Sequence, residues 1–518
     1  MSGSVTVPGV SGSIVTVSPG TGDVLELARA IGALLANISV TGGLQITADT
    51  VSGAIPARPA YTGVQSVSEL VLQGSPTINS TIPAGYNYVV NVDTVPVTLS
   101  GSNVDIIGGT VGSSYTVAGN STVAATGGNN TVTASGTYEL SFGPGNNLII
   151  ASGVGTIATG IGNNTVVGAG TGEVIGTGSG PSTVSLTGSG GVVYAGTGDL
   201  TAAVTGTSDA IGLYTGPAVV TLGGSGNTIF ANSGPATIDE TGSGNAIGAS
   251  TGPVSMLSSG SNTSVFGGSG PLSADMEGPG AVVGLGSGPA AITLSGAGGA
   301  VNAGSGPLTL LATGDGSDTI GLSTGYASID AGGSTSLQVY GGSGQLVFVG
   351  GAGSSSVFGG PGAASLFGTA GSMITYVGEG SVSGSFAAGT GNETLNAAGS
   401  YGPVTEAASS VGGSADSLVG GAGSDTLIGG VGASTMTGGG GANLFEFTSV
   451  VGGGAATITD FNSSDSVLLQ GYGAAAASAA LAAATQSGTS TILTLSDGTA
   501  ITFLNVTPGQ LSGHITST

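Results

Sequence analysis

The stretch Gly224–Ser259 reads GSGNTIFAN, SGPATIDET, GSGNAIGAS and TGPVSMLSS, which are four segments of nine residues. Two kinds of segment alternate, so the repeating unit is 18 residues long. In each segment a glycine-rich corner precedes a short run that alternates apolar and polar residues. Glycine supplies the positive φ that tight corners need, and the alternation is typical of a short strand with one buried face. Two segments therefore predict one coil of a flattened parallel β-solenoid, an all-β fold.

The same repeat extends far on both sides of this stretch. Prolines in the pattern x-[ST]-G-P follow one another at intervals of 18, at Pro217, Pro235, Pro253, Pro271, Pro289 and Pro307. Upstream, the phrases GGNNTV, GPGNNL and GIGNNTV keep a similar interval. The pattern runs from about Thr81 to Phe447, which corresponds to roughly 20 coils. Because one coil cannot bury its own apolar face, stacked neighbours must supply both the core and the strand pairing.

The composition narrows the classes of function. The chain has 518 residues, a formal net charge of −24, no lysine and no cysteine, and its two basic residues are Arg29 and Arg58. It therefore lacks the cations that nucleic acid or an anionic membrane surface would require. It also lacks disulfides, thiolate metal sites and any apolar run long enough for a transmembrane helix. The N-terminus shows no signal peptide of the Sec type, so we expect that export, if it occurs, uses another signal.

The two ends of the chain depart from the repeat. Residues 1–80 are expected to form a capping or assembly region, with apolar residues at helical spacing that predict a helix over Gly22–Asn37. Thr21 and Asp23 are its candidate capping residues. The helix would either cap the first coil or act as a handle for a neighbouring subunit or the cell surface. Near the other end, Ala474–Ala484 predicts a second short helix, followed by a hairpin that turns at Asp497-Gly498.

The segment GGAGSDTLI, at Gly420–Ile428, resembles the calcium-binding nonapeptide G-G-x-G-x-D-x-U-x of the RTX (hemolysin-type) family. The residues after it, ATITDFNSSDSVLLQGYG and then the hairpin, look like the C-terminal module of bacterial proteins exported by type I systems. The resemblance is strong over Val411–Thr518 and only architectural over Thr81–Ser410. It implies a β-roll of two nonapeptides per coil, bound calcium, an uncleaved C-terminal export signal and an extracellular or cell-surface location. The expected division is 1–80, a Gly-rich solenoid at 81–410, RTX-type repeats at 411–447 and a secretion module at 448–518.

The family resemblance also implies where calcium would bind. In that family the carboxylate of the repeat binds calcium together with glycine-turn carbonyls on successive coils, and calcium prefers six to eight oxygen ligands. In this chain the carboxylate position is often occupied by asparagine or serine instead. A few calcium sites are therefore expected, and their candidate ligands are Asp416, Asp425, Asn443, Asp315, Asp318 and Asp460.

For the long middle of the chain, a metal-free arrangement is favoured. Asn130, Asn147 and Asn164 lie 17 residues apart in equivalent positions of three repeats. Amide side chains stacked in such a column can hydrogen-bond up and down it without like-charge repulsion. We therefore expect an asparagine ladder in these coils.

The sequence offers little support for catalysis. There is no lysine, and the single histidine, His514, lies in the last five residues and is expected to be exposed. The carboxylates Asp239 and Asp275 are 36 residues apart, or two coils, with Glu240 and Glu277 beside them. Such a pair could act in glycoside hydrolysis, but a solvated edge is the favoured interpretation. We predict that the protein is not an enzyme.

The sequence as a whole favours a structural function. The 18-residue register is regular, the ends differ, and terminal coils of a solenoid present unpaired strand edges unless they are capped. We therefore expect a secreted protein that self-assembles outside the bacterial cell into filaments or biofilm matrix, with calcium assisting folding or assembly. A surface-layer protein or adhesin is the alternative, and a polysaccharide-active extracellular enzyme is a weaker one. The expected partners are further copies of the chain, in a head-to-tail filament or lattice, and cell-surface polysaccharide.

Overall fold

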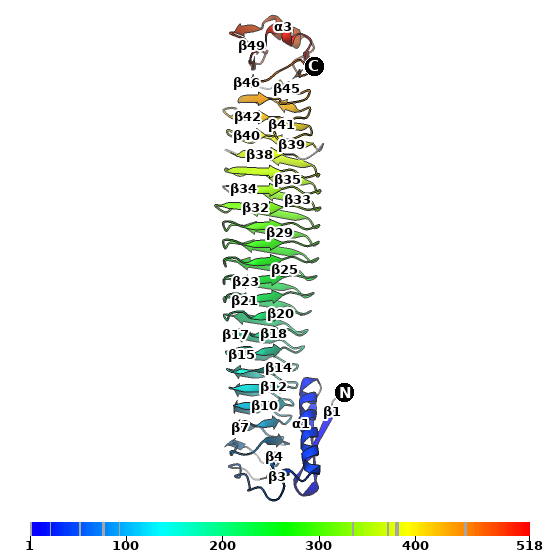
Figure 1. Cartoon of the computed structure of the whole chain (residues 1–518), viewed down its shortest axis with the longest axis vertical. Coiled ribbons are helices and arrows are strands. Elements are labelled where there is room, and N and C mark those ends of the chain that lie inside the picture. The colour runs from blue at the N-terminus through cyan, green and yellow to red at the C-terminus, as the bar shows by residue number, and fades with distance from the viewer. Residues whose placement is uncertain are drawn as a thin grey trace. The chain divides into compact units, whose positions relative to one another are not determined.

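The structure is a computed structural model that describes residues 3–20, 22–50, 53–74, 78–92, 94–333, 336–369, 372–378, 383–449 and 453–518. The chain forms two compact units, Met1–Met256 (unit 1) and Leu257–Thr518 (unit 2). Each unit is a parallel β-solenoid, and together they contain about 21 coils of about 18 residues (Figure 1). The predicted fold class is therefore confirmed.

The strands of unit 1 form two parallel sheets, and from β4 onward each coil contributes one strand to each sheet. The first sheet contains β3 (Leu44–Asp49), β4 (Val67–Leu72), β6 (Tyr88–Asn91), β8 (Asp105–Ile107), β10 (Asn120–Ala125), β12 (Thr137–Phe142), β14 (Val154–Ala158), β16 (Val174–Gly176), β18 (Val192–Tyr194), β20 (Ala210–Gly212), β22 (Thr228–Phe230) and β24 (Ala246–Gly248). The second sheet contains β5 (Ile78–Thr81), β7 (Val97–Ser102), β9 (Ser114–Ala118), β11 (Thr131–Ala134), β13 (Leu148–Ala151), β15 (Asn164–Gly168), β17 (Ser182–Leu186), β19 (Leu200–Val204), β21 (Ala218–Leu222) and β23 (Ala236–Glu240). Strand β25 (Val254–Ser258) contains the boundary between the units.

Unit 2 repeats this arrangement. Its first sheet contains β26 (Ser264–Phe266), β28 (Val282–Gly284), β30 (Ala300–Asn302), β32 (Ser317–Gly321), β34 (Ser336–Tyr340), β36 (Ser354–Phe358), β38 (Met373–Val377), β40 (Thr394–Asn396), β42 (Ala415–Val419), β44 (Ala433–Thr437), β46 (Ala455–Ile458), β48 (Thr485–Ser487), β49 (Ser490–Thr494) and β50 (Ala500–Phe503). Its second sheet contains β27 (Leu272–Met276), β29 (Ala290–Leu294), β31 (Leu308–Ala312), β33 (Ala327–Asp330), β35 (Leu346–Val349), β37 (Ala364–Phe367), β39 (Gly384–Ala387), β41 (Val404–Ala407), β43 (Thr426–Ile428), β45 (Leu444–Thr448), β47 (Ser466–Gln470) and β51 (Ile515–Ser517).

The core of each unit consists of aliphatic columns between the two sheets. In unit 1, Ile211 and Ile229 pair in register on the first sheet, and Val220 and Ile238 pair on the second. All four side chains are buried. Each fully buried aliphatic side chain contributes about 1.5–3 kcal/mol, so regular stacking over many coils stabilises the fold. Buried aromatic side chains such as Tyr115 and Phe348 add to this core.

Glycine is required where the corners of successive coils touch. A Cβ atom added to Gly224 would lie 1.6 Å from the carbonyl oxygen of Gly206, one coil earlier. Two residues further on, Gly226 has a φ of +67°, a left-handed conformation that side chains disfavour. The glycine-rich corners predicted from the sequence therefore serve both close approach and turning.

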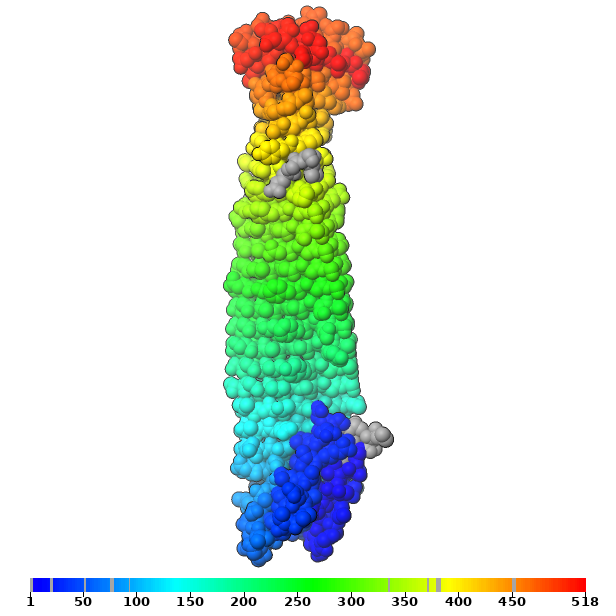
Figure 2. Space-filling model, turned by 45° about the vertical axis from the view of Figure 1, so that its right-hand side comes forward, coloured from blue at the N-terminus to red at the C-terminus, as the bar shows by residue number. Residues whose placement is uncertain are grey.

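The N-terminal region lies on the side of the first coils. Strands β1 (Gly3–Pro8) and β2 (Ile14–Gly20) form an antiparallel hairpin around η1 (Val10–Gly12), and α1 (Asp23–Val40) follows. Figure 2 shows this blue region against the light-blue coils of unit 1. The predicted helix is confirmed and ends three residues later than expected, while its candidate cap Thr21 lies outside the described residues.

Of the two expected roles of this helix, a cap across the end of the first coil does not match its position along the side of the first sheet, and a handle for assembly stays a prediction. Buried residues of α1 such as Ala28 and Leu35 pack with Val90, Ile107 and Ala124, which belong to three different strands of the first sheet. These outward-facing side chains are apolar, so they provide a lateral apolar face for the helix. The solenoid strands also begin at Leu44 rather than near Thr81, because the aliphatic alternation of β3 and β4 pairs in parallel well before the glycine-rich repeats start.

The C-terminal end of unit 2 follows the prediction. Helix α2 (Ala476–Ala482) lies within the expected segment, and β49 and β50 form an antiparallel hairpin around Asp497-Gly498. A final short helix, α3 (Pro508–Leu511), precedes β51. Among the described residues, no helix has the length and apolar character needed to cross a membrane.

Candidate functional site

The two carboxylates expected to bind calcium in the RTX-like repeats lie buried inside unit 2. Asp425 accepts backbone N–H bonds from Val404 at Oδ1 (2.8 Å) and from Gly421 at Oδ2 (2.7 Å). Asp416 accepts from the N–H groups of Glu393 (3.2 Å) and Ser409 (2.8 Å). Each carboxylate therefore joins one coil to its neighbour by binding backbone donors.

These bonds continue into a ladder towards the C-terminus. The N–H of Asp425 donates to Asn443 Oδ1 (3.0 Å), and the N–H of Asn443 donates to Asp465 Oδ1 (2.9 Å). The structure thus brings Asp425 and Asn443 together as predicted. It adds Asp465, which the sequence analysis missed because its step from Asn443 is 22 residues instead of 18. Asp460 accepts from the N–H groups of Gly438 and Gly439, both at 2.8 Å.

The side chains of Asp315 and Asp318, the second predicted pair, differ in burial. Asp318 is fully buried, and its Oδ1 accepts the N–H of Gly299 at 2.7 Å. Burial raises the pKa of Asp318 above its ordinary value. Asp315 is exposed at the corner that precedes β32. The two side chains therefore occupy different environments, one inside the coil and one facing solvent.

Backbone donors bind the carboxylates that were predicted as calcium ligands. Each oxygen of Asp416, Asp425 and Asp460 accepts one backbone N–H group, so one of its two lone pairs is already used and the other is left for a cation. Within the described ranges, no group of three or more acidic or histidine side chains converges as metal ligands. Calcium thus stays a prediction that rests on the sequence resemblance.

Two buried glutamates lie beside these aspartates and were not expected to matter. Glu406 is fully buried, and burial together with the nearby Asp425 raises its pKa to about 8. Glu393 is buried next to Asp416, and desolvation followed by that neighbouring charge raises its pKa to about 7. A carboxyl group with so high a pKa stays neutral in mildly acidic surroundings.

The asparagine ladder predicted for unit 1 is confirmed. Asn130 Nδ2 donates to Asn147 Oδ1 (2.9 Å), and Asn147 Nδ2 donates to Asn164 Oδ1 (2.8 Å). All three side chains are buried. Each amide thus satisfies a buried polar group on the next coil, which would be costly to leave unpaired.

A second ladder, on the first sheet of unit 1, was not predicted. The N–H of Gly191 donates to Asp209 Oδ1 (2.7 Å), and that of Asp209 donates to Asn227 Oδ1 (2.8 Å). The N–H of Asn227 continues the ladder to Asn245 Oδ1 (2.8 Å). The signal was present in the sequence, because Asn227 and Asn245 occupy the same place in two GSGN phrases 18 residues apart.

The residues considered for catalysis have separate environments. Asp239 is exposed on β23, whereas the adjacent Glu240 is buried and accepts a bond from Asn245 Nδ2 (2.7 Å). In unit 2, Asp275 is half-buried on β27 and Glu277 is exposed.

The expectation that His514 is an exposed tail residue is wrong. His514 belongs to the packed C-terminal end of unit 2. It is half-buried, its Nδ1 lies 2.9 Å from the Asp465 carbonyl, and its ring meets Phe461 edge-on. The reason is that β51 pairs in parallel with β47, which draws the last residues onto the solenoid.

The first coil of unit 1 presents open strand edges. Among the described residues, β3 pairs only with β4, and β5 pairs only with β7. The carbonyls of Gly43 and Asp49 face β4, where they accept N–H bonds from Val67 and Gln73. Because backbone groups alternate along a strand, those of residues 44, 46 and 48 point to the free edge.

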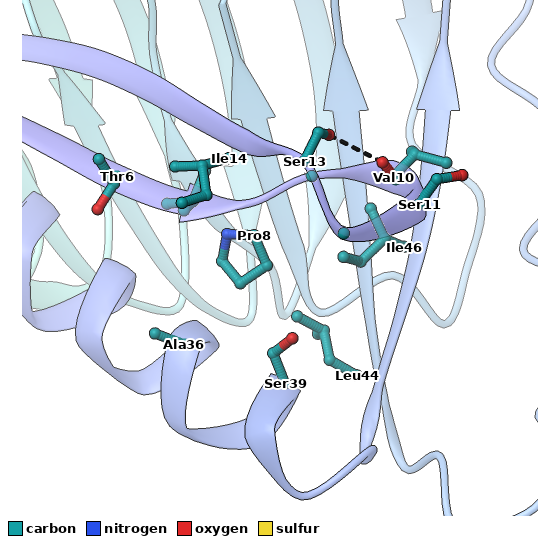
Figure 3. Close-up of a pocket in the computed structure, with 13 residues that line it drawn as sticks. Thr6, Pro8, Val10, Ser11, Ser13, Ile14, Ala36, Ser39, Leu44 and Ile46 are labelled. Carbon is teal, nitrogen blue, oxygen red and sulfur yellow. Dashed lines mark hydrogen bonds between the residues drawn. The ribbon is translucent and has the colours of Figure 1, made fainter.

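A cavity lies beside this open edge. Its volume is about 470 Å³, and it is bounded by the β1–β2 hairpin, α1 and β3. Figure 3 shows Pro8, Leu44 and Ile46 around it, with Ser13 Oγ donating to the Val10 carbonyl at 2.8 Å. Ile14 at its rim is 72% exposed, so the first coil combines unpaired backbone groups with apolar surface.

The last coil of unit 2 is covered differently. Strand β50 pairs with β46 and then with β49, which pairs in turn with β48. The last two pairings are antiparallel and turn the sheet edge into a hairpin. Helix α2 lies against β51, with the Ala477 N–H donating to Ser517 Oγ at 3.2 Å.

Comparison with protein-family models and with curated proteins found no match for this chain.

Proposed function

We propose that this protein is a secreted structural protein that self-assembles outside the bacterial cell, as filaments or as part of a biofilm matrix. The observation that supports this best is the open edge of β3 in the first coil. A row of unpaired N–H and C=O groups is a template for pairing with another chain, and solenoid proteins normally cover such ends. The exposed Ile14 and the adjacent cavity add apolar surface that association would bury.

Export by a type I system and assistance by calcium are separate parts of the proposal. Both rest on the resemblance of Val411–Thr518 to RTX proteins and not on the arrangement of the carboxylates. A surface-layer protein or adhesin is the alternative, and it would use the same open edge within a lattice at the cell surface.

The test replaces Ala48 with proline. Residue 48 points its N–H to the free edge, so Ala48→Pro removes an edge donor while the bonds between β3 and β4 are kept. The matched control, Ala48→Ser, keeps the N–H. We expect electron micrographs and sedimentation velocity to show assemblies for the native chain and Ala48→Ser, and at least tenfold less assembled protein for Ala48→Pro.

The proposal is contradicted if the native chain does not assemble. Uniform single molecules of the native chain, with calcium and with a chelator, at concentrations up to those of a matrix, would mean that the open edge does not support assembly. Assemblies that form only on cell envelopes would favour the surface layer.

A further inference from the structure

One outward-facing column of unit 1 alternates glycine and aromatic residues. At the last position of the strands β16, β18, β20, β22 and β24, the pairing register aligns Gly176, Tyr194, Gly212, Phe230 and Gly248. Tyr194 is 60% exposed and Phe230 is 59% exposed. The coil between those of Tyr194 and Phe230 carries Tyr214, which lies two residues after Gly212. Tyr214 is 52% exposed. Three successive coils thus each present one aromatic ring, and we call Tyr194, Tyr214 and Phe230 the aromatic row.

Two rings of this row, those of Tyr194 and Phe230, lie beside the glycines of the next coil. A Cβ added to Gly212 would lie 3.8 Å from Cδ1 of Tyr194, and one added to Gly248 would lie 3.7 Å from Cδ1 of Phe230. Each ring therefore leans over the glycine of the next coil. The residues two positions earlier on these strands carry no charge and no aromatic ring; they are Val174, Val192, Ala210, Thr228 and Ala246.

Unit 2 contains the same pattern by itself. Phe266 is 55% exposed and leans over Gly284, whose added Cβ would lie 3.6 Å from its Cδ1. Further along the same column, Tyr340 and Phe358 stack with their ring centroids 5.0 Å apart. An exposed aromatic column in both units is unusual for a chain in which only 4% of residues are aromatic.

We propose that the aromatic row of unit 1 binds an uncharged, extended polysaccharide by stacking its sugar rings on Tyr194, Tyr214 and Phe230. The face of an aromatic ring is electron-rich and attracts polarised C–H groups such as those on the flat side of a sugar. Successive coils are about 4.8 Å apart, so Tyr194 and Phe230 are separated by about 9.6 Å. This period is close to that of two sugars in an extended β-linked chain.

The distribution of charge on the protein favours an uncharged ligand. The strands β16 to β24 of the first sheet carry no charged residue, while the chain as a whole has a net charge of −24. Both arginines, Arg29 and Arg58, lie in the N-terminal region, outside these strands. An acidic polysaccharide or a nucleic acid would be repelled without a cationic group to pair with it. A neutral glycan meets no such penalty.

This inference goes beyond self-assembly and does not depend on it. A purely structural role, in which the rings only cover the neighbouring glycines, predicts a loss of stability on truncation but no loss of binding. A second copy of the chain is the other occupant to distinguish, because exposed apolar columns can also mediate contacts between proteins.

The test uses the full chain carrying Ala48→Pro, so that assembly at the β3 edge does not interfere. Binding is measured by co-sedimentation with microcrystalline cellulose and by mobility in gels that contain a soluble neutral β-glucan or, separately, polygalacturonate. We expect Tyr194→Ala/Tyr214→Ala/Phe230→Ala to weaken binding to both neutral glucans at least tenfold. Tyr194→Phe keeps the ring and should retain binding, and Tyr401→Ala removes a 76% exposed tyrosine outside the row as the matched control.

Three results would overturn the proposal. These are no retention of the parent chain on either neutral glucan, tighter binding to polygalacturonate than to the neutral glucans, or equal binding by the triple variant with an unchanged melting curve. If the triple variant instead abolishes a dimer of the glycan-free parent in sedimentation velocity, the row is a contact between copies of the chain. None of these results changes the outcome of the Ala48→Pro test, which measures assembly at the β3 edge.

Discussion

The buried polar side chains inside the solenoid connect neighbouring coils through individual hydrogen bonds. Each amide of the Asn130–Asn147–Asn164 ladder donates or accepts across one coil, which lets a glycine-rich chain keep polar groups buried without ions. Glu69 is different, because neither of its carboxylate oxygens has a hydrogen-bond partner within the described residues. It pairs in register with Ile46 and Tyr88, which pack on the cluster beneath α1. It is fully buried, and burial raises its pKa to about 8.

This buried carboxyl makes the stability of unit 1 depend on pH. The pKa of Glu69 in the folded state, about 8, lies above its ordinary value of 4.5. Its contribution is therefore fully present below about pH 4.5 and is lost as the pH rises through about 8. We expect Glu69→Gln to flatten the fall in melting temperature between these values, measured by circular dichroism. The exposed Glu139→Gln is the control, and an unchanged slope for Glu69→Gln would contradict this assignment.

At the scale of elements, the sequence predicted what is local and repeated. The 18-residue period, α1, α2 and the hairpin at Asp497-Gly498 follow from spacing and turn chemistry alone. The position of α1 could not be predicted, because its partners Val90, Ile107 and Ala124 lie on three different strands, and the repeat alone does not show which outward face a helix covers. In the candidate site, the sequence predicted that Asp425 and Asn443 lie together but not which backbone groups their side chains bind.

Asp425 illustrates why orientation escaped prediction. The sequence places it in a calcium-type repeat, yet its oxygens meet the N–H groups of Val404 and Gly421. Val404 lies 21 residues earlier, a step that departs from the 18-residue period. The irregular spacing of these coils therefore decides which backbone donors surround the carboxylate.

The contact between glycine corners leads to a prediction for the strands that they connect. Gly224→Ala would place Cβ 1.6 Å from the Gly206 carbonyl oxygen, so two coils would have to separate locally. We expect a loss of roughly 3 kcal/mol or more in the free energy of unfolding, measured with urea. In Gly176→Ala the nearest atom would lie at 3.9 Å, so this control should change stability by less than about 1 kcal/mol. Equal losses of stability in the two variants would show that the close contact between corners does not determine the effect of Gly224→Ala.

At the scale of the whole molecule, calcium can be tested through thermal stability. A calcium ion at Asp416 or Asp425 would share carboxylate oxygens that already accept backbone N–H bonds, which weakens their attraction for the ion. We therefore expect calcium to raise the melting temperature only at roughly millimolar concentrations, and Asp425→Asn to reduce the shift. Stabilisation that saturates at micromolar calcium would mean that the carboxylates are arranged differently when the ion is bound. No shift at all would remove calcium from the proposed function.

The difference between the first and last coils has a consequence for how assemblies would grow. In the language of polymer chemistry, a monomer with one reactive end is monofunctional and terminates a chain after a single coupling. The first coil, with β3 and β5, is such an end, whereas in the last coil the short antiparallel strand β48 replaces the parallel edge of the first sheet and α2 lies against β51. Coupling through β3 alone would yield pairs, and propagation to fibres would need a second, lateral contact. Assembly should then show two concentration thresholds, one for pairs and a higher one for growth.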